Sequence, residues 1–530
     1  MHDHLTIDLT SHHRDLLDLT IPEALDRAAR AWPNAGALHF IDTGQRMTWA
    51  QLQQAVSRVR SALEALGLKP GDKVGLMLRN QIEFPLAWLA VIDAGALAVP
   101  VNPRYTRREV DAVLGDAGAS WLVVTEDLRE HVAGAVPPGN VVVTGHSGAP
   151  GNAEGRTFEE LLRHPATPRT HQARRRDVVG LQFTSGTTGL PKGCLLTHEY
   201  WLDLAVYGAA AFGDPQRILA DHPFFYMQNQ AYLMTALASG GQLYVTSGLS
   251  RRTFMRWLTD HGIDMAWIDE GMLKQEPSEL DHRLQLKKAP VSAISPALHK
   301  PLEERFGLMA RELYASTEVG PSTFVPWERT DLVGSGSMGW CLPHRESKVI
   351  DAAGAETAPG EVGELCLRGS GMMLGYHNRP EVNAELFLPG GWFRTGDLVR
   401  KTADGQHFFL GRARDMVRRS GENISSAEVE LHMQAQPEVA EVGVIPVPDP
   451  ERGEEVKAIV VPKPGSTVTA AQIISWCRQG LAPFKVPRYI EFRDTLPHTP
   501  SGKIAKSVLK AEDPLHDGVV DTRAVSSDPL

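Results

Sequence analysis

The segment best suited to chemistry is the run Thr184-Ser185-Gly186-Thr187-Thr188-Gly189-Leu190-Pro191-Lys192-Gly193. Its ten residues include four hydroxyl side chains, three glycines and one lysine. Glycine lets the backbone approach a ligand closely, and hydroxyls, amides and an ammonium group suit phosphate oxygens. The apolar run 178–183 before it predicts a strand, so we expect a polyphosphate-binding loop after a strand. The loop differs from that of common nucleoside triphosphatases, because Pro191 precedes the lysine and Gly193 follows it.

Five further motifs follow along the chain. They are Tyr314-Ala315-Ser316-Thr317-Glu318, Gly391-Trp392-Phe393-Arg394-Thr395-Gly396-Asp397-Leu398, Gly411-Arg412-Ala413-Arg414-Asp415, Ser420-Gly421-Glu422-Asn423-Ile424 and Pro500-Ser501-Gly502-Lys503. In this order, and with the first segment, they resemble the motifs of the adenylate-forming enzymes, which include acyl-CoA synthetases, luciferases and peptide-synthetase adenylation domains. The resemblance spans roughly residues 20–510 and favours the acid–CoA ligase branch.

The resemblance implies that a carboxylic acid attacks the α-phosphate of ATP, forming an acyl-adenylate and pyrophosphate. Such a step needs cations placed around spread negative charge. The implied catalytic residues are Lys192, Thr317, Glu318 and Lys503, with Glu318 as the Mg²⁺ ligand because Mg²⁺ prefers oxygen. The implied ATP site comprises Thr184, Ser185, Gly186, Thr187, Thr188, Gly189, Lys192, Tyr314, Ala315, Ser316, Thr317, Asp397, Arg412 and Lys503.

Each charged residue of this set also fits a purely structural role when it is taken alone. Glu318 suits the start of a helix, where the macrodipole favours a carboxylate. Asp397 suits the cap of a turn, Arg412 a surface ion pair and Lys503 a solvated turn. The ordered set of motifs favours the catalytic interpretation over these alternatives.

The resemblance also implies a second half-reaction, in which the thiol of coenzyme A attacks the adenylate. A small C-terminal domain is thought to rotate between the two steps in such synthetases. Arg414 matches the hinge position, and Ser420, Gly421 and Glu422 match the strand that lines the pantetheine tunnel. Glycine at position 421 suits a backbone that passes close to a slender ligand.

The acyl pocket is expected to include Tyr226, Gln228, Asn229, Asp269, Glu270, Ser292 and Ala293. Tyr226 stands where the family usually has a histidine, and the segment 292–296 departs from the usual glycine-rich pattern beside adenine. An acidic wall at Asp269 and Glu270 would suit a small, polar or cationic acid better than a long fatty chain, since buried charge needs a partner. The alternative is that both carboxylates face solvent or an internal arginine.

The spacing of apolar residues predicts the helices and strands around these residues. Apolar residues recur at helical spacing over 48–67, where Thr48 and Gln51 predict a capping box. Alternating strands and helices predict two doubly wound sheets in a large N-terminal domain, residues 1–410. Within it, residues 330–410 are expected to form a small β-rich subdomain. We further expect a hinge at 411–414, a small mobile α+β domain at 415–510 and a mobile tail at 511–530.

Composition narrows the class of protein and its partners. The chain has 530 residues and a formal net charge of -10, which does not favour nucleic acid as a partner. The four cysteines lack metal or redox spacing, so a reduced cytoplasmic setting is expected. The longest apolar stretch, 87–101, is too interrupted to span a bilayer. The expected partners are a small carboxylic acid, ATP and coenzyme A, and a homodimer is left open.

The sequence thus predicts an ATP-dependent acid–CoA ligase that forms AMP and pyrophosphate. Three alternatives stay open at this point: an adenylating enzyme that loads a carrier protein, a luciferase-like monooxygenase, and a catalytically silent nucleotide-binding homologue. The lysines and carboxylates retained at 192, 318, 397 and 503 argue against the silent homologue.

Overall fold

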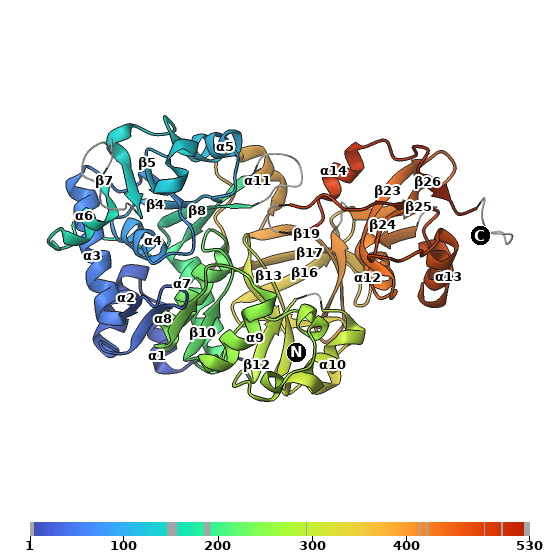
Figure 1. The fold of residues 1–530 in the computed structure, drawn as a ribbon, viewed down its shortest axis with the longest axis horizontal. Helices are drawn as coiled ribbons and strands as arrows, with labels where there is room; N and C mark the ends of the chain where they lie inside the picture. Colours follow the sequence, from blue (N-terminus) through green and yellow to red (C-terminus); the bar gives the residue numbers. More distant parts are fainter. Residues whose placement is uncertain are drawn as a thin grey trace. The chain divides into compact units, whose positions relative to one another are not determined.

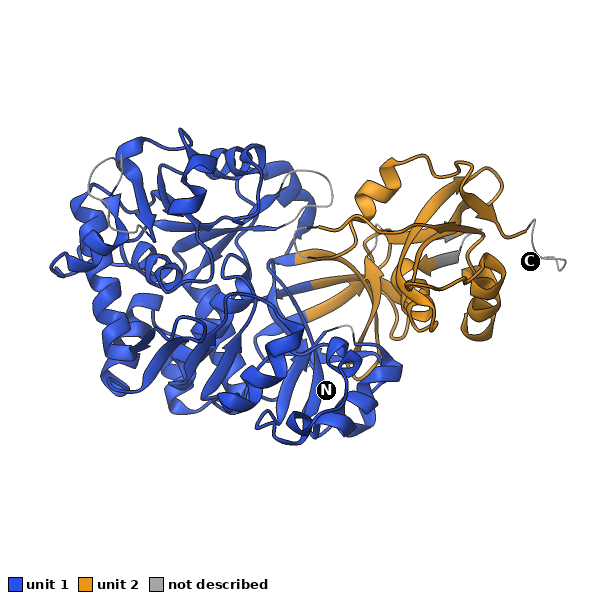
Figure 2. Cartoon of the chain, in the orientation of Figure 1, with its two compact units in different colours: residues 1–184, 190–346, 367–392 blue, residues 185–189, 347–366, 393–530 orange. Residues whose placement is uncertain are grey.

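The computed structural model describes residues 5–145, 156–184, 191–292, 294–412, 415–419, 422–481, 483–499 and 502–523. The chain divides into two compact units (Figure 2). Unit 1 comprises residues 1–184, 190–346 and 367–392, and unit 2 comprises residues 185–189, 347–366 and 393–530. The α/β class predicted from the sequence is confirmed, with a large unit built on several sheets and a smaller α+β unit. The predicted boundaries of the domains and the hinge stay predictions.

One sheet of unit 1 has seven strands in the order β7-β6-β5-β3-β4-β8-β9. Its strands are β3 (Lys73–Met77), β4 (Leu97–Pro100), β5 (Trp121–Thr125), β6 (Val141–Thr144), β7 (Arg156–Thr157), β8 (Val178–Thr184) and β9 (Lys192–Thr197). Strands β4, β5, β7 and β8 are labelled in Figure 1. Neighbouring strands are parallel except β8 and β9, which are antiparallel. Helix α5 (Arg107–Ala117) packs Val110, Val113 and Leu114 onto this sheet, and α4 (Glu83–Asp93) packs on β3 and β4.

Local sequence signals explain where the helices of this layer begin. Helix α3 (Trp49–Ala65) has Thr48 as its N-cap. The hydroxyl of Thr48 accepts from the amide of Gln51 at 3.3 Å, and Gln51 Oε1 accepts from the amide of Thr48 at 2.9 Å. The predicted capping box is therefore present. Helix α6 (Phe158–Arg163) contacts β6 and β7, whereas α2 (Ile21–Ala31) packs on α3 and α4, and α1 (Ser11–Leu16) packs on α7 (His198–Phe212).

A second, four-stranded sheet of unit 1 has the order β10-β11-β1-β2. Its strands are β1 (Gly36–Phe40), β2 (Arg46–Thr48), β10 (Arg217–Ala220) and β11 (Gln242–Val245). Helices α7 (His198–Phe212) and α8 (Met227–Ser239) pack against each other. Further along the chain, α9 (Arg251–Asp260) and α10 (Pro296–Phe306) share a buried core with β12 (Lys288–Val291) and β13 (Met309–Ser316). Two antiparallel strands, β14 (Gly320–Phe324) and β15 (Ser337–Cys341), continue from β13.

Unit 2 contains a β-rich part and an α+β part. The strands β16 (Arg345–Ile350), β17 (Val362–Gly369), β19 (Trp392–Lys401) and β20 (His407–Arg412) belong largely to the first. The second is a sheet of order β22-β21-β24-β25-β26, to which β23 adds by pairing with β24. Its elements are β21 (Met416–Arg419), β22 (Glu422–Ser425), β23 (Val439–Asp449), β24 (Gly453–Pro462), β25 (Tyr489–Phe492), β26 (Val519–Asp521), α12 (Ser426–Gln434), α13 (Ala470–Gly480) and α14 (Lys506–Ala511).

One strand lies where the sequence predicts none. Strand β26 falls in the segment expected to be a mobile tail, yet it pairs with β25, and Arg488 forms an ion pair with Asp521 at 3.1 Å. The four cysteines are buried, and none of them forms a disulfide bond. Within the described residues, no helix is both long and apolar enough to cross a bilayer.

Candidate active site

The hairpin of β8 and β9 positions the two described ends of the glycine–hydroxyl loop. Thr184 ends β8 and Lys192 begins β9, and the two residues face each other in the antiparallel register. Thr184 Oγ1 donates to the carbonyl of Lys192 at 3.4 Å. The loop therefore joins two strands, and α7 begins only after β9, with Thr197 as its N-cap. The predicted residues Ser185, Gly186, Thr187, Thr188 and Gly189 lie outside the described residues.

Tyr376 connects the lysine of this hairpin to the predicted metal ligand. The ammonium of Lys192 lies 4.9 Å from the centre of the Tyr376 ring. The phenol of Tyr376 donates to Glu318 Oε1 at 2.7 Å. The chain beside Tyr376 is fixed on β9, because the amide of Leu195 donates to the carbonyl of Gly375 and the amide of His377 to that of Gly193, at 2.9 and 2.8 Å. One aromatic side chain thus contacts both charged groups.

Glu318 lies in the tight turn that joins β13 to β14. The predicted residues Tyr314, Ala315 and Ser316 end β13, Thr317 and Glu318 form the turn, and Gly320 starts β14 with a φ of 61°. The Glu318 side chain is half-buried, and within the described residues only Oε1 of its carboxylate has a hydrogen-bond partner. Mg²⁺ is commonly held by one or two carboxylates together with substrate phosphates, so this carboxylate fits the metal.

Two buried neighbours of these charges remain neutral. Burial raises the pKa of the Cys194 thiol well above its ordinary value, and the nearby charge of Glu318 adds to the rise. Burial likewise raises the pKa of Tyr200, whose hydroxyl contacts the sulfur of Met227 at 3.7 Å. Lys192 and Glu318 therefore lie near uncharged, desolvated side chains, and electrostatic interactions are stronger in such surroundings than in water.

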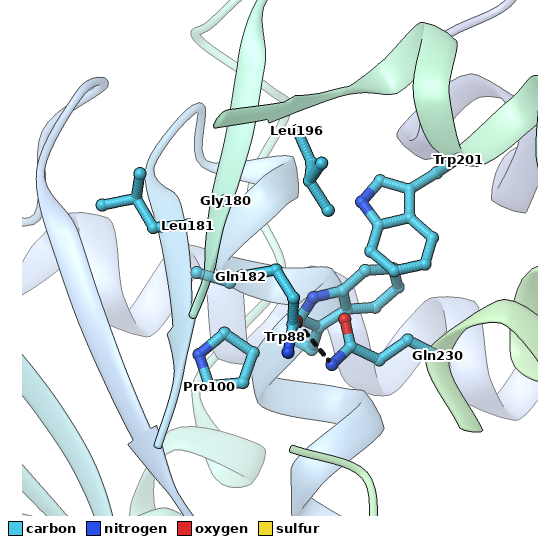
Figure 3. Close-up of a pocket in the computed structure, with 9 residues that line it drawn as sticks. Trp88, Pro100, Gly180, Leu181, Gln182, Leu196, Trp201 and Gln230 are labelled. Atoms are coloured by element: carbon cyan, nitrogen blue, oxygen red, sulfur yellow. Dashed lines mark hydrogen bonds between the residues drawn. The ribbon is translucent and has the colours of Figure 1, made fainter. Parts of the chain in front are cut away.

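The segment 223–226, which ends at the expected acyl-pocket residue Tyr226, is tied to β8 by two glutamines. Gln182 of β8 donates to the carbonyl of Phe225 at 2.8 Å, and Gln230 of α8 donates to that of Phe224 at 2.8 Å. Gln230 Nε2 also lies 3.3 Å from Gln182 Oε1. Figure 3 shows the pair in a small buried cavity that is otherwise lined mainly by apolar side chains, among them Trp88, Pro100, Leu196 and Trp201. Hydrogen bonds thus connect the segment 223–226 to β8, the strand that leads into the glycine–hydroxyl loop.

Tyr226 itself is the N-cap residue of α8, where it makes no side-chain capping bond. Its hydroxyl is buried and has no hydrogen-bond partner among the described residues, and the same holds for Gln228 Nε2 and Asn229 Oδ1. Burial raises the pKa of Tyr226, so the phenol stays protonated and is available as a donor. Three neighbouring residues expected in the acyl pocket therefore each present a buried polar atom that has no hydrogen-bond partner within the part of the chain that the structure describes.

The two carboxylates expected to form an acidic wall have backbone partners. Asp269 is exposed, and its Oδ1 accepts from the amide of Gly271 at 2.6 Å as the N-cap of a short 3-10 helix, Glu270–Lys274. Glu270 Oε2 accepts from the amide of Ser295 at 3.3 Å. Ser292 donates to the carbonyl of Leu313 at 2.9 Å, and Ala293 lies outside the described residues. These contacts weaken the argument for a cationic acid.

In unit 2, Asp397 and Arg412 face each other across β19 and β20. The side chain of Asp397 is 1% exposed, and its Oδ1 lies 2.7 Å from Arg412 Nε. The amide of Asp397 donates to Thr395 Oγ1 at 3.1 Å, and Arg412 Nη1 donates to the carbonyl of Thr395 at 3.2 Å. These contacts position the Asp397 carboxylate, and a buried carboxylate of this kind suits two vicinal hydroxyls.

Lys503 lies on a closed turn of unit 2 and remains exposed at the surface. The amide of Thr499 donates to the carbonyl of Lys503 at 2.7 Å, and Gly502 has a φ of 79°. Surrounding protein removes part of the hydration of the ammonium and lowers the pKa of Lys503, and the charge of Arg412 lowers it further, while Asp397 opposes the shift. Arg414, Ser420 and Gly421 lie outside the described residues, and Glu422 begins β22.

Tyr376 is the functional side chain that sequence reasoning misses, and the Gly375-Tyr376 pair at the end of a glycine-rich stretch is its only local signal. Of the predicted residues, Lys192 and Glu318 meet through it in unit 1. Asp397, Arg412 and Lys503 influence one another in unit 2.

Comparison with known proteins shows the family of the chain. The AMP-binding enzyme family matches residues 25–377, and the AMP-binding enzyme C-terminal domain matches residues 428–503. A feruloyl-CoA synthase from Amycolatopsis sp is 32% identical over 91% of this chain and 97% of its own length. A long-chain-fatty-acid–CoA ligase from Escherichia coli O157:H7 is 29% identical over 92% and 93%. The crystal structure of an anthranilate CoA ligase in complex with anthranoyl-AMP is 26% identical over 94% and 98%, with a TM-score of 0.84. The chain belongs to the AMP-binding enzyme family.

Proposed function

We propose that this chain joins a small or polar carboxylic acid to coenzyme A through an acyl-adenylate. The reaction class follows from the family and its relatives, and the chain is an ATP-dependent acid–CoA ligase. The assignment of the site residues is supported above all by Tyr376, which contacts both the Lys192 ammonium and the Glu318 carboxylate. A homodimer and a cytoplasmic location stay predictions from the sequence.

In the first half-reaction, a carboxylate oxygen of the acid attacks the α-phosphorus of ATP, and the bond to the β-phosphate breaks to release pyrophosphate. Lys192 and the hydroxyls of the adjoining loop would hold the departing phosphates. Mg²⁺ held by Glu318 would neutralise part of their charge. Asp397 and Arg412 would hold the ribose, and Lys503 would stabilise charge at the reacting carboxylate and α-phosphate.

In the second half-reaction, the sulfur of coenzyme A attacks the acyl carbon, the bond to the phosphate oxygen breaks, AMP leaves and the thiol proton passes to solvent. The strand around Gly421 would line the path of the thiol, as the resemblance implies. Lys503 would have no part in this step, because the phosphoryl chemistry is then complete.

The preference for a small or polar acid is supported by residues 226–229 of the expected acyl pocket. Tyr226, Gln228 and Asn229 each carry a buried polar atom without a partner among the described residues. A buried donor or acceptor that stays unpaired costs free energy, which a polar acyl group can offset and a fatty chain cannot. Two relatives, a feruloyl-CoA synthase and an anthranilate CoA ligase, are named for acids with polar substituents, although another is named for long-chain fatty acids.

The test is ATP–pyrophosphate exchange over a panel of short, hydroxy-aromatic, amino-aromatic and long-chain acids, followed by thioester detection with and without coenzyme A. We expect exchange with small or polar acids and thioester only when coenzyme A is present. Best turnover on long-chain acids would overturn the proposed acid class. Adenylate formation without transfer to coenzyme A would favour a carrier protein as the acceptor, and absence of exchange with every acid would overturn the function.

A further inference from the structure

Arg345, at the start of β16, is a buried cation that the proposed reaction does not use. Its side chain is 1% exposed. Its guanidinium donates to the carbonyl of Val319 from Nε at 3.2 Å and from Nη2 at 2.6 Å. It also donates from Nη2 to the carbonyl of Gly371 at 2.8 Å and from Nη1 to those of Ser370 and, at 3.3 Å, His344. The buried charge is therefore solvated almost entirely by backbone carbonyls.

Apart from that of His344, these carbonyls belong to the two segments that carry Glu318 and Tyr376. Val319 directly follows Glu318 in the turn between β13 and β14. Ser370 and Gly371 open the segment that leads to Tyr376. The two segments also touch directly, since the amide of Met373 donates to the carbonyl of Glu318 at 2.9 Å. Arg345 thus donates hydrogen bonds to both of the segments that bring Glu318 and Tyr376 into contact.

The backbone at Ser370 and Gly371 is closely packed against Asp203. Gly371 has a φ of 66°, and a Cβ placed there would lie 2.8 Å from the Cβ of Asp203. Asp203, which is 1% exposed, accepts from Ser370 Oγ and from Arg175 Nη2, each at 2.6 Å. Desolvation lowers the pKa of Arg345 to about 10, with Asp203 opposing the shift, so the guanidinium stays charged near neutral pH. A buried charge is tolerated only when hydrogen bonds satisfy it, and here they do.

We propose that Arg345 is a positioning residue that fixes the carboxylate of Glu318 against Tyr376 by holding the carbonyls of Val319, Ser370 and Gly371. The inference rests on the proposed role of Glu318 as a Mg²⁺ and ATP ligand. A guanidinium suits this task because its planar fork of donors reaches several carbonyls at once, whereas a lysine ammonium acts as a point charge on a flexible stem. Partners of this kind, which orient a metal ligand without touching the metal, typically change metal affinity or activity by about 10–100-fold when removed.

The test compares Arg345→Met with the matched control Arg311→Met. Arg311 is also 1% exposed and lies on β13, where it donates to the carbonyls of Ala310 and Trp327 at 2.7 and 2.9 Å and pairs with Glu303. Both variants lose a buried arginine, so both are expected to unfold at lower temperature. Only Arg345→Met should raise the Mg²⁺ concentration for half-maximal pyrophosphate exchange, by about tenfold or more.

A readout independent of turnover is amide hydrogen exchange of the protein without substrates. In Arg345→Met, but not in Arg311→Met, peptides covering 317–321 and 370–376 should exchange faster. Arg345→Lys keeps the charge without the fork and should show an intermediate Mg²⁺ requirement. It also serves as the test if Arg345→Met does not fold.

An unchanged Mg²⁺ requirement in a folded Arg345 variant, or equal changes in both arginine variants, would overturn the inference. Failure of the wild-type protein to exchange pyrophosphate would instead overturn the proposed function. The hydrogen-exchange comparison would still report on Arg345 in that case.

Discussion

The two units present their charged groups in different ways. In unit 1, Lys192 and Glu318 contact one tyrosine, and the segments that carry them are joined by backbone hydrogen bonds. In unit 2, the pair Asp397 and Arg412 is equally fixed, but Lys503 lies exposed on a turn with a lowered pKa. The groups proposed to bind phosphate, metal and ribose thus have several protein partners, while Lys503, proposed to act at the reacting centre, lies exposed on a turn.

This difference suggests a division of labour. Charges fixed in advance stabilise a transition state without reorganisation, which suits groups that are needed in every turnover. A lysine that serves only one of two half-reactions gains from being easy to withdraw. The number of protein contacts and the exposure of a side chain would then separate the groups that bind in every turnover from the lysine that acts in a single step.

The largest effect is expected for Lys503→Ala. Removing one positioned charge from a transition state typically costs about 10²–10³-fold in rate, so acid-dependent pyrophosphate exchange should fall by that amount. Thioester formation from supplied acyl-adenylate and coenzyme A should stay near the wild-type rate. The exposed Lys463 of the same unit provides the control Lys463→Ala, which should leave both steps unchanged. Equal loss of both half-reactions in Lys503→Ala would break the separation.

A smaller effect is expected for Tyr376→Phe, which removes the hydrogen bond to Glu318 and keeps the ring beneath Lys192. A hydrogen bond to a charged group contributes about 1.5–3 kcal/mol, so the rate of exchange at low Mg²⁺ should fall by about 10–100-fold. Tyr376→Leu should lose more, because the ring contact with the ammonium disappears as well. The measurement is pyrophosphate exchange as a function of Mg²⁺ and ATP, with Tyr244→Phe in β11 as the control. Wild-type Mg²⁺ dependence in Tyr376→Phe would show that the hydrogen bond from Tyr376 does not position Glu318 for Mg²⁺.

Periodicity and capping predicted most of the fold because these signals are local. The Thr48–Gln51 box marks the start of α3, and apolar runs mark β3, β5 and β8. Strand β26 was missed because its formation depends on the edge of β25 and on Arg488, which are far away in the sequence. Local patterns carry no information about such distant partners.

In the candidate site, too, local motifs predicted some residues, while contacts between distant parts of the sequence could not be predicted. Motifs pointed to Lys192, Glu318 and Asp397, which the structure places in hydrogen-bonded or ring-contacting sets. Tyr376 escaped prediction because it meets Glu318 across 58 positions of sequence. Asp269 shows the converse limit, since its residue type suggested a pocket wall but its carboxylate caps a 3-10 helix. Residue type indicates which chemistry is available, whereas the partner of a side chain depends on tertiary structure.

The smallest effect expected is a shift in pH dependence that reports on Lys503 alone. Its pKa is lowered chiefly by lost hydration and then by Arg412, while Asp397 opposes the shift. The ammonium therefore loses its proton at a lower pH than an ordinary lysine. Because the charged form is the active one, exchange should be full below this pKa and decline above it. Arg412→Gln removes a positive neighbour, so the pKa of Lys503 should rise and the alkaline decline should move to higher pH.

Lys503→Arg supplies the control for this assignment, because a guanidinium stays protonated throughout the range. The alkaline decline should vanish in the residual exchange activity of this variant, even though its rate is reduced by the altered geometry. A decline that persists in Lys503→Arg would assign the titration to another group. A movement to lower pH in Arg412→Gln would show that the charge of Arg412 does not lower the pKa of Lys503.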